Sequence, residues 1–132
     1  MTDRTKERRA CQRFVIPGAT VYYKQNRFLF YGKFTEDFYP VFDISRGGMR
    51  FLCQRFLKTA TDMTLKLIVP AETAPLLIKG RVSWISPNPG KSYKYQVGIQ
   101  FAPYGKNKGD NDPAVLQGLT ALEKKFGAAS SI

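Results

Sequence analysis

Apolar and polar residues alternate along three segments of this chain, 61–69, 76–86 and 95–101. Alternation with a period of two is typical of β-strands that bury one face. The residues expected to face inward are Met63, Leu65, Leu67, Val69, Ile78, Gly80, Val82, Trp84, Tyr95, Val97, Ile99 and Phe101. Because the pattern recurs so often, it favours a closed or nearly closed antiparallel β-barrel.

The first part of the chain is rich in aromatic and β-branched residues, which also favour strands. Residues 19–24 predict one strand, and the aromatic-rich residues 27–42 predict two strands joined by a turn near Glu36 and Asp37. Apolar runs at 39–42 and 49–52 flank the polar stretch 43–48. That stretch is therefore expected to be a turn between two strands.

The last part of the chain has the spacing of a helix. Asp112 is a predicted N-cap and Pro113 fits the first helical position. The expected apolar stripe is Val115, Leu119, Leu122 and Phe126. Lys124–Lys125 are expected in the last turn and Gly127 as the C-cap. Because Gly118 costs a helix about 1 kcal/mol relative to alanine, this helix should depend on packing against the barrel or a partner.

Length and composition indicate one cytoplasmic domain. The chain has 132 residues, of which 43% are hydrophobic, and no apolar run approaches the length of a membrane span. The charged N-terminus lacks the apolar core of a secretory signal. Cys11 and Cys53 lack metal-binding spacing and are interpreted as reduced thiols, although a disulfide between them stays open.

The charge balance points to an anionic partner and away from catalysis. The formal net charge is +11, which suits nucleic acid, a nucleotide, a membrane surface or an acidic protein. The chain has no histidine, and so it lacks the commonest general base and the commonest metal ligand. With no paired carboxylates in one motif and no phosphate-binding loop, we expect no enzyme activity, no catalytic residues and no metal or cofactor.

Two short clusters carry the candidate chemistry. Residues 1–13 hold five basic and two acidic residues and are expected to form a flexible arm, of which Arg13 lies at the junction with the apolar Phe14-Val15-Ile16. Taken alone, the arm is equally consistent with a solvated basic tail that binds no ligand. Residues 43–48 place a carboxylate, a hydroxyl and two glycines in one turn. Glycine permits a positive φ and close approach of a ligand, although Asp and Ser are also ordinary turn residues.

Together these clusters resemble the PilZ domain family, which carries an RxxxR motif before its first strand and a (D/N)xSxxG motif after its second. Arg9-Ala-Cys-Gln-Arg13 matches the first motif and Asp43-Ile-Ser45-Arg-Gly-Gly48 the second. Residues 80–84 and 97–101 resemble later strands of the family. The resemblance covers roughly residues 7–104. It implies a six-stranded antiparallel barrel, with the arm at 1–13, the barrel at 14–104, and a linker and helix at 105–132.

The resemblance implies a stand-alone receptor for cyclic di-GMP, a bacterial second messenger. On the family pattern, Arg9 and Arg13 take guanine edges and phosphates, since a guanidinium donates in pairs to both. Asp43 accepts from the guanine N1 and N2 donors. Ser45 orients the turn or donates to the ligand, and Gly48 with Gly47 leaves room for the base. This assignment is an expectation from the family, although the residue types suit the ligand independently.

Two further residues belong to the predicted site. Arg8 precedes the RxxxR motif, and in the family an arginine there tends to accompany a stacked pair of ligands, so we expect that a stacked dimer can bind. Trp84 is the only tryptophan. We favour a core position for it, with a ring at the barrel surface touching the ligand as the alternative.

The expected mechanism is that the ligand draws the arm against the barrel and alters binding of an effector protein. Two alternative functions stay open. The first is a basic β-barrel that binds nucleic acid, although the carboxylate of Asp43 would repel a phosphate backbone. The second is a PilZ-like scaffold that no longer binds nucleotide. The aromatic segment 26–34 is longer than the family pattern predicts. It is either an ordinary hairpin or an apolar patch for a partner or a second copy.

Overall fold

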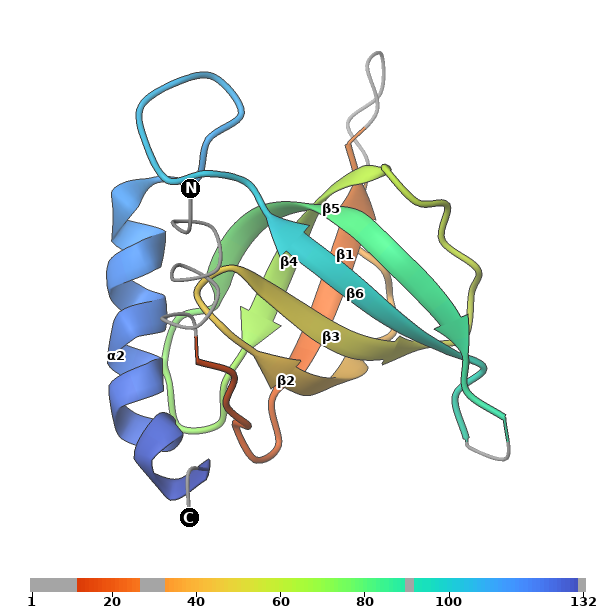
Figure 1. Ribbon diagram of the computed structural model, residues 1–132, viewed down its shortest axis with the longest axis horizontal. Coiled ribbons are helices and arrows are strands. Elements are labelled where there is room, and N and C mark those ends of the chain that lie inside the picture. Colours follow the sequence, from red (N-terminus) through yellow and green to blue (C-terminus); the bar gives the residue numbers. More distant parts are fainter. Residues whose placement is uncertain (1–11, 27–32, 90–91, 131–132) are drawn as a thin grey trace, which may run out of the picture.

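The computed structural model describes residues 12–26, 33–89 and 92–130, with side chains through residue 127. Its strands and helix are β1 (Thr20–Gln25), β2 (Tyr39–Ile44), β3 (Gly48–Cys53), β4 (Asp62–Ile68), β5 (Leu76–Pro87), β6 (Tyr95–Phe101) and α2 (Pro113–Ser130). The strands form a closed antiparallel barrel in the order β1-β2-β3-β6-β5-β4 (Figure 1). The predicted mainly-β fold, a six-stranded antiparallel barrel followed by a helix, is therefore confirmed.

The barrel interior is filled by the alternating residues of its strands. The predicted inward face of β4 is confirmed, because Met63, Leu65 and Leu67 are fully buried while Thr64 and Lys66 are partly exposed. The other fully buried large side chains are Phe14, Val21, Ile44, Met49, Phe51, Ile78, Val82, Val97 and Leu119. Such a core accounts for most of the stability expected of a domain this size.

Two early expectations about the strands are wrong. Residues 33–38 form a loop and not a strand, since the Thr35 hydroxyl donates to the Asp37 carbonyl at 2.9 Å and closes a local turn. Residues 27–32 lie outside the described residues. The second error concerns Asp43 and Gly48, which lie at the ends of β2 and β3, so that the connecting turn is only Ser45–Gly47.

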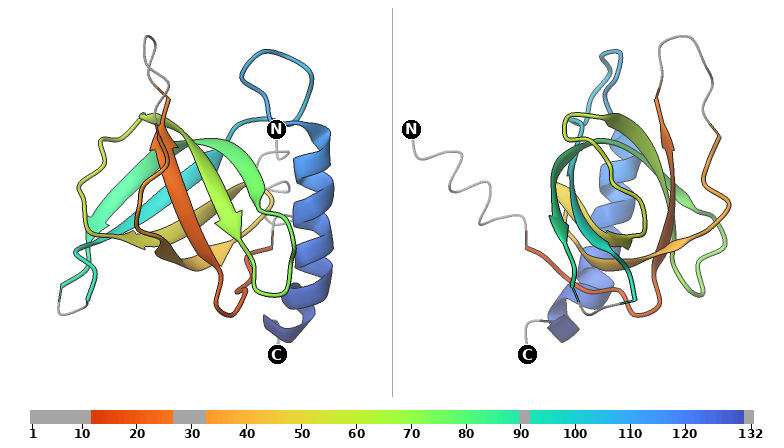
Figure 2. Two further views of the ribbon diagram at one scale, coloured as in Figure 1. Left: turned by 180° about the vertical axis from the view of Figure 1, so that it is seen from behind. Right: turned by 90° about the vertical axis from the view of Figure 1, so that its right-hand side faces the viewer.

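Helix α2 lies against one side of the barrel (Figures 1 and 2). Asp112 caps it as predicted, since its Oδ1 accepts from the Ala114 N–H at 2.8 Å. Gly118 lies close to β5, because a Cβ there would lie 3.1 Å from Leu76 Cδ1. The predicted C-cap at Gly127 is wrong: the helix continues to Ser130, and no basic residue lies in its last turn. A glycine C-cap requires a positive φ, and Gly127 does not adopt one.

Candidate functional site

The acid of the second motif, Asp43, is a buried carboxylate held by two arginines. Its side chain is 8% exposed. Arg13 Nη1 donates to Asp43 Oδ1 at 3.0 Å. Arg50 Nε donates to Oδ1 at 2.9 Å and to Oδ2 at 3.1 Å, and Arg50 Nη2 also donates to Oδ2. Both carboxylate oxygens are therefore occupied by guanidinium groups.

The two arginines are held with different strength. Arg13 makes one hydrogen bond to Asp43 and its side chain is 51% exposed, which is typical of ion pairs that contribute little. The Arg50 side chain is 30% exposed and donates to both oxygens of Asp43. Its guanidinium also lies 4.6 Å from the ring centre of Phe42 in a cation–π contact. The hydrogen bond to Asp43 raises the pKa of Arg50 above its ordinary value, against the opposing effect of burial. Arg13 is therefore the more easily displaced partner.

A short backbone bridge brings Arg13 to Asp43. Phe14 exchanges two hydrogen bonds with Ile44, at 2.9 Å and 3.0 Å, and its side chain is 1% exposed. This buried anchor fixes the backbone of Arg13 near the end of β2, from where its long side chain reaches Asp43. The expectation that Arg13 is anchored by the apolar residues after it agrees with this geometry.

Ser45 organises the turn between β2 and β3. Its Oγ accepts from the Gly47 N–H at 3.1 Å, and its own N–H donates to the Gly48 carbonyl at 2.8 Å. The side chain is buried. Ser45 is therefore placed to shape the turn, which is one of the two roles expected of it.

One glycine of the motif is required for packing within the barrel. Neither Gly47 nor Gly48 has a positive φ. A Cβ on Gly48 would lie 2.4 Å from the Ile99 carbonyl oxygen. Gly48 is thus required because β3 and β6 approach closely at this point.

The turn is also tied to the C-terminal part of the chain. Arg46 Nε lies 3.1 Å from Glu123 Oε1 of α2 in an ion pair. The Arg46 carbonyl accepts from the Tyr104 hydroxyl, and the Gly47 carbonyl accepts from the Phe101 N–H at 2.9 Å. Arg46 thus links the turn to the helix.

Trp84 lies outside the core, and its predicted core position is wrong. A β-bulge between Val82 and Trp84 shifts the register of β5 against β6, so that Ile85 packs on the core and Trp84 is opposite Gly98. A Cβ on Gly98 would lie 2.1 Å from Trp84 Nε1, so the indole lies across the bare backbone of β6. The alternative, a ring at the barrel surface, is the one the structure supports.

Strand register places the site residues in one row. Asp43 is opposite Arg50, Arg50 is opposite Gly98, and Gly98 is opposite Trp84. Directly opposed residues share a face of the sheet, so this row crosses the outside of β2, β3, β6 and β5. It offers two guanidinium groups at one end and an aromatic ring at the other.

Not every predicted site residue can be placed. Arg8 and Arg9 lie outside the described residues, as does Cys11, whereas Cys53 is a buried free thiol. Arg50 was missed as a contact of Asp43. The register that pairs Asp43 with Arg50 depends on the bounds of the turn, and a turn over 43–48, as expected from the sequence, places Asp43 opposite Gly48 instead.

The described residues contain no group of three or more side chains suited to hold a metal ion. In the same part of the chain, no helix has the length and apolar character needed to cross a membrane.

The family model for the PilZ domain matches residues 7–110. A solved structure, that of the Bacillus subtilis inhibitor of motility (MotI/DgrA), resembles this fold with a TM-score of 0.52 and 19% sequence identity. The match covers 89% of this chain and 52% of that chain, so this sequence spans about half of that protein's length. At such identity the likeness concerns the fold alone. No curated protein matches the sequence significantly. Since the family model covers most of the sequence and both motifs, the chain belongs to the PilZ domain family.

Proposed function

We propose that the chain is a receptor for cyclic di-GMP and that the ligand binds on the outer face of β2 and β3. PilZ domains bind this nucleotide and effector proteins. One observation carries the proposal: Arg13 and Asp43, one from each family motif, lie 3.0 Å apart although 30 residues separate them. The two motifs therefore converge on one surface.

The chemistry of the ligand suits this surface. Guanine offers paired acceptors at O6 and N7 and paired donors at N1 and N2. An arginine fork matches the acceptors and also the phosphates, whereas a carboxylate such as that of Asp43 matches the donors. In this proposal Arg9 and Arg13 bind the nucleotide, Asp43 accepts from a guanine, and Ser45, Gly47 and Gly48 hold the backbone around it.

Both oxygens of Asp43 are already occupied, so the ligand must exchange with one of the arginines. The half-exposed single contact of Arg13 is the weaker one. We therefore propose that Arg13 leaves Asp43 for a phosphate or a guanine edge, while Arg50 keeps the carboxylate charged and oriented. Arg50 thus acts as a positioning residue.

Trp84 and Arg8 extend the proposal. The indole of Trp84 lies on the same outer row as Arg50, and stacking of a base on an aromatic ring contributes about 1–3 kcal/mol. If Arg8 offsets the negative charge of a second cyclic di-GMP molecule, the ligand binds as a stacked dimer and the stoichiometry is two ligand molecules per chain. Contacts from Arg9 would order the segment before Gln12 against the barrel and so alter the surface that an effector meets.

Calorimetric titration with cyclic di-GMP tests the proposal. We expect binding at micromolar concentration or tighter, and at least about tenfold weakening in Arg9→Ala, Arg13→Ala and Asp43→Ala, since each removes charge-assisted contacts of about 1.5–3 kcal/mol. Arg8→Ala should lower the stoichiometry from two to one. Arg55→Ala is the matched control, because Arg55 is an exposed arginine outside the site.

Titration with two other ligands distinguishes cyclic di-GMP binding from the two alternative functions. Cyclic di-AMP lacks the guanine donors and should bind much more weakly. An oligothymidylate should bind weakly, with a steep salt dependence. If cyclic di-GMP does not bind at micromolar levels, or binds equally well to the Arg9 and Arg13 variants, the chain is either a nucleic-acid binder or a scaffold without nucleotide.

A further inference from the structure

A second surface of the barrel combines lysines with aromatic rings. It lies over β1, β4 and β5, and β4 is diametrically across the closed barrel from β3. Figure 2 (left) shows β1 and β4 side by side on the side of the barrel that is hidden in Figure 1. The two surfaces share β5 but use different parts of it, because the pocket described below takes residues 79–81 and the row that starts at Asp43 reaches β5 at Trp84.

The lysines of this surface lie over aromatic rings. Lys66 Nζ lies 4.7 Å from the ring centre of Phe34 and 5.0 Å from that of Tyr22. Lys24 Nζ lies 5.0 Å from the ring centre of Phe34. The ring of Phe38, which is 55% exposed, packs edge-on against Tyr22. These five residues form what we call the lysine–aromatic face.

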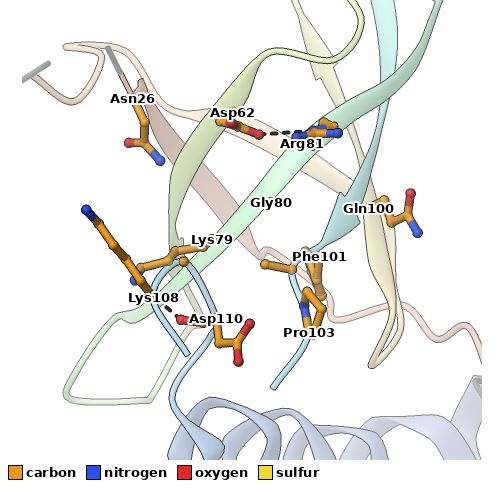
Figure 3. Close-up of a pocket in the computed structure, with 12 residues that line it drawn as sticks. Asn26, Asp62, Lys79, Gly80, Arg81, Gln100, Phe101, Pro103, Lys108 and Asp110 are labelled. Atoms are coloured by element: carbon orange, nitrogen blue, oxygen red, sulfur yellow. Dashed lines mark hydrogen bonds and ion pairs between the residues drawn. The ribbon is translucent and has the colours of Figure 1, made fainter. Parts of the chain in front are cut away.

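An open pocket of about 710 Å³ adjoins this face (Figure 3). Strand register connects the two, since Lys24 is opposite Thr64 and Thr64 is opposite Lys79, which lines the pocket. Lys79 on β5 and Lys108 on the loop after β6 flank the pocket, with the Asp62–Arg81 pair at its other end (Figure 3).

The loop that forms one wall of the pocket is firmly fixed. Asn111 is 1% exposed. Its Oδ1 accepts from the Lys79 N–H at 2.7 Å, and its Nδ2 donates to the carbonyls of Lys79 at 2.9 Å and Ala102 at 3.0 Å. These bonds hold the end of the loop beside the pocket against β5.

The charges of this surface are unbalanced. Asp62 is paired with Arg81 at 3.0 Å, and Asp110 Oδ2 accepts from the Asn107 N–H at 3.1 Å. Within the described ranges, no carboxylate pairs with the lysines of the face and pocket, which are Lys24, Lys66, Lys79 and Lys108. This holds also for Glu36 and Asp37, in the loop between Phe34 and Phe38.

We infer that the lysine–aromatic face and its pocket bind an acidic segment of a partner protein that also carries an apolar side chain. The partner's carboxylates pair with these lysines, among them Lys79, whose Nζ in the unbound chain donates to the Asp110 carbonyl at 3.3 Å. Its apolar side chain packs beside Phe38. Since the surface lies across the barrel from Asp43, partner and nucleotide can bind at the same time.

The geometry favours a polypeptide over a nucleic acid. Single-stranded nucleic acids bind by stacking bases on free ring faces. The rings of Phe34 and Tyr22 already lie beneath ammonium groups, which leaves less ring surface for a base. Carboxylates instead reach the exposed side of those ammonium groups.

Selection from a display library of random twelve-residue peptides against the full chain tests this inference, with affinities then measured by fluorescence anisotropy. We expect the enriched peptides to carry several Asp or Glu and at least one apolar residue. The double variant Lys66→Glu/Lys79→Glu should weaken their binding at least about tenfold, because it replaces attraction by like-charge repulsion. Lys58→Glu/Lys94→Glu carries the same change of charge on exposed lysines elsewhere and should change affinity less than about twofold.

Other results would overturn the inference. These are enrichment of no peptides or of non-acidic peptides, equal weakening by both double variants, and competition by a twelve-residue oligothymidylate at equal concentration. Asp43→Ala should leave peptide binding unchanged, because the inference does not depend on the nucleotide site. Thermal unfolding of each variant confirms that it is folded.

Discussion

Gly98→Ala tests how Trp84 lies on the barrel. The new Cβ would be 2.1 Å from Trp84 Nε1 and 2.2 Å from Cε2, whereas ordinary contact begins at 3.4 Å. The indole must therefore retreat by more than 1 Å or swing off β6 into solvent. Gly98 pairs with both Arg50 and Trp84. The substitution therefore alters the row of residues from Asp43 to Trp84 on the outside of the barrel without removing a charge.

The cost follows from the surface that the ring covers. Rehydrating roughly 50 Å² of apolar surface at about 25 cal/mol/Å² destabilises the fold by about 1 kcal/mol. Alanine recovers about 0.5 kcal/mol of backbone entropy relative to glycine, and residual strain acts in the opposite direction. We therefore expect the free energy of unfolding to fall by about 1 kcal/mol.

The single tryptophan makes the assay specific. Its emission should shift to longer wavelength and its quenching by acrylamide should increase in Gly98→Ala, while circular dichroism stays that of a barrel. Affinity for cyclic di-GMP should fall about tenfold if a base stacks on this ring. Unchanged emission and quenching would refute the placement of the indole. A changed spectrum with unchanged affinity would refute only its role in the ligand site.

The remaining predictions concern stability. Gly48→Ala should destabilise by about 2–3 kcal/mol in urea unfolding, because its Cβ would meet the Ile99 carbonyl at 2.4 Å. Gly127→Ala, whose Cβ meets only the flexible Glu123 side chain, should instead stabilise by up to about 1 kcal/mol; equal effects would contradict both. Burial raises the pKa of Tyr23 above its ordinary value of 10.0, so the unfolded state loses this proton first and stability should fall as pH rises above about 10. Tyr23→Phe should reduce that fall, although the raised pKa of Tyr39 preserves part of it, and an identical alkaline loss in the variant would exclude Tyr23 as a source.

Much of the fold could be predicted because strand periodicity records burial directly. The inward residues of β4 followed from alternation alone, and the helix began at its predicted cap. The errors arose where an element departs from its period. The bulge in β5 moved Trp84 to the outer surface, and alternation has no means of showing where one residue is inserted.

The candidate site could be predicted only in part. The motifs identified Arg13 and Asp43, but their contact depends on the bridge between Phe14 and Ile44, which joins segments far apart in sequence. The role of Gly48 is a contact with β6 that no local pattern encodes. Arg50 escaped prediction because its position opposite Asp43 follows from the observed register of β2 and β3, which the expected turn over 43–48 does not reproduce.

The attachment of the β2–β3 turn to α2 has an evolutionary consequence. Arg46 meets Glu123 through its side chain and Tyr104 through its carbonyl, so a residue inside the signature motif depends on the sequence of the C-terminal helix. Among related chains, positions 46 and 123 should therefore covary in charge, even though position 46 is a free position of the DxSxxG pattern. A helix exchanged between relatives should be tolerated only when this pair is exchanged with it.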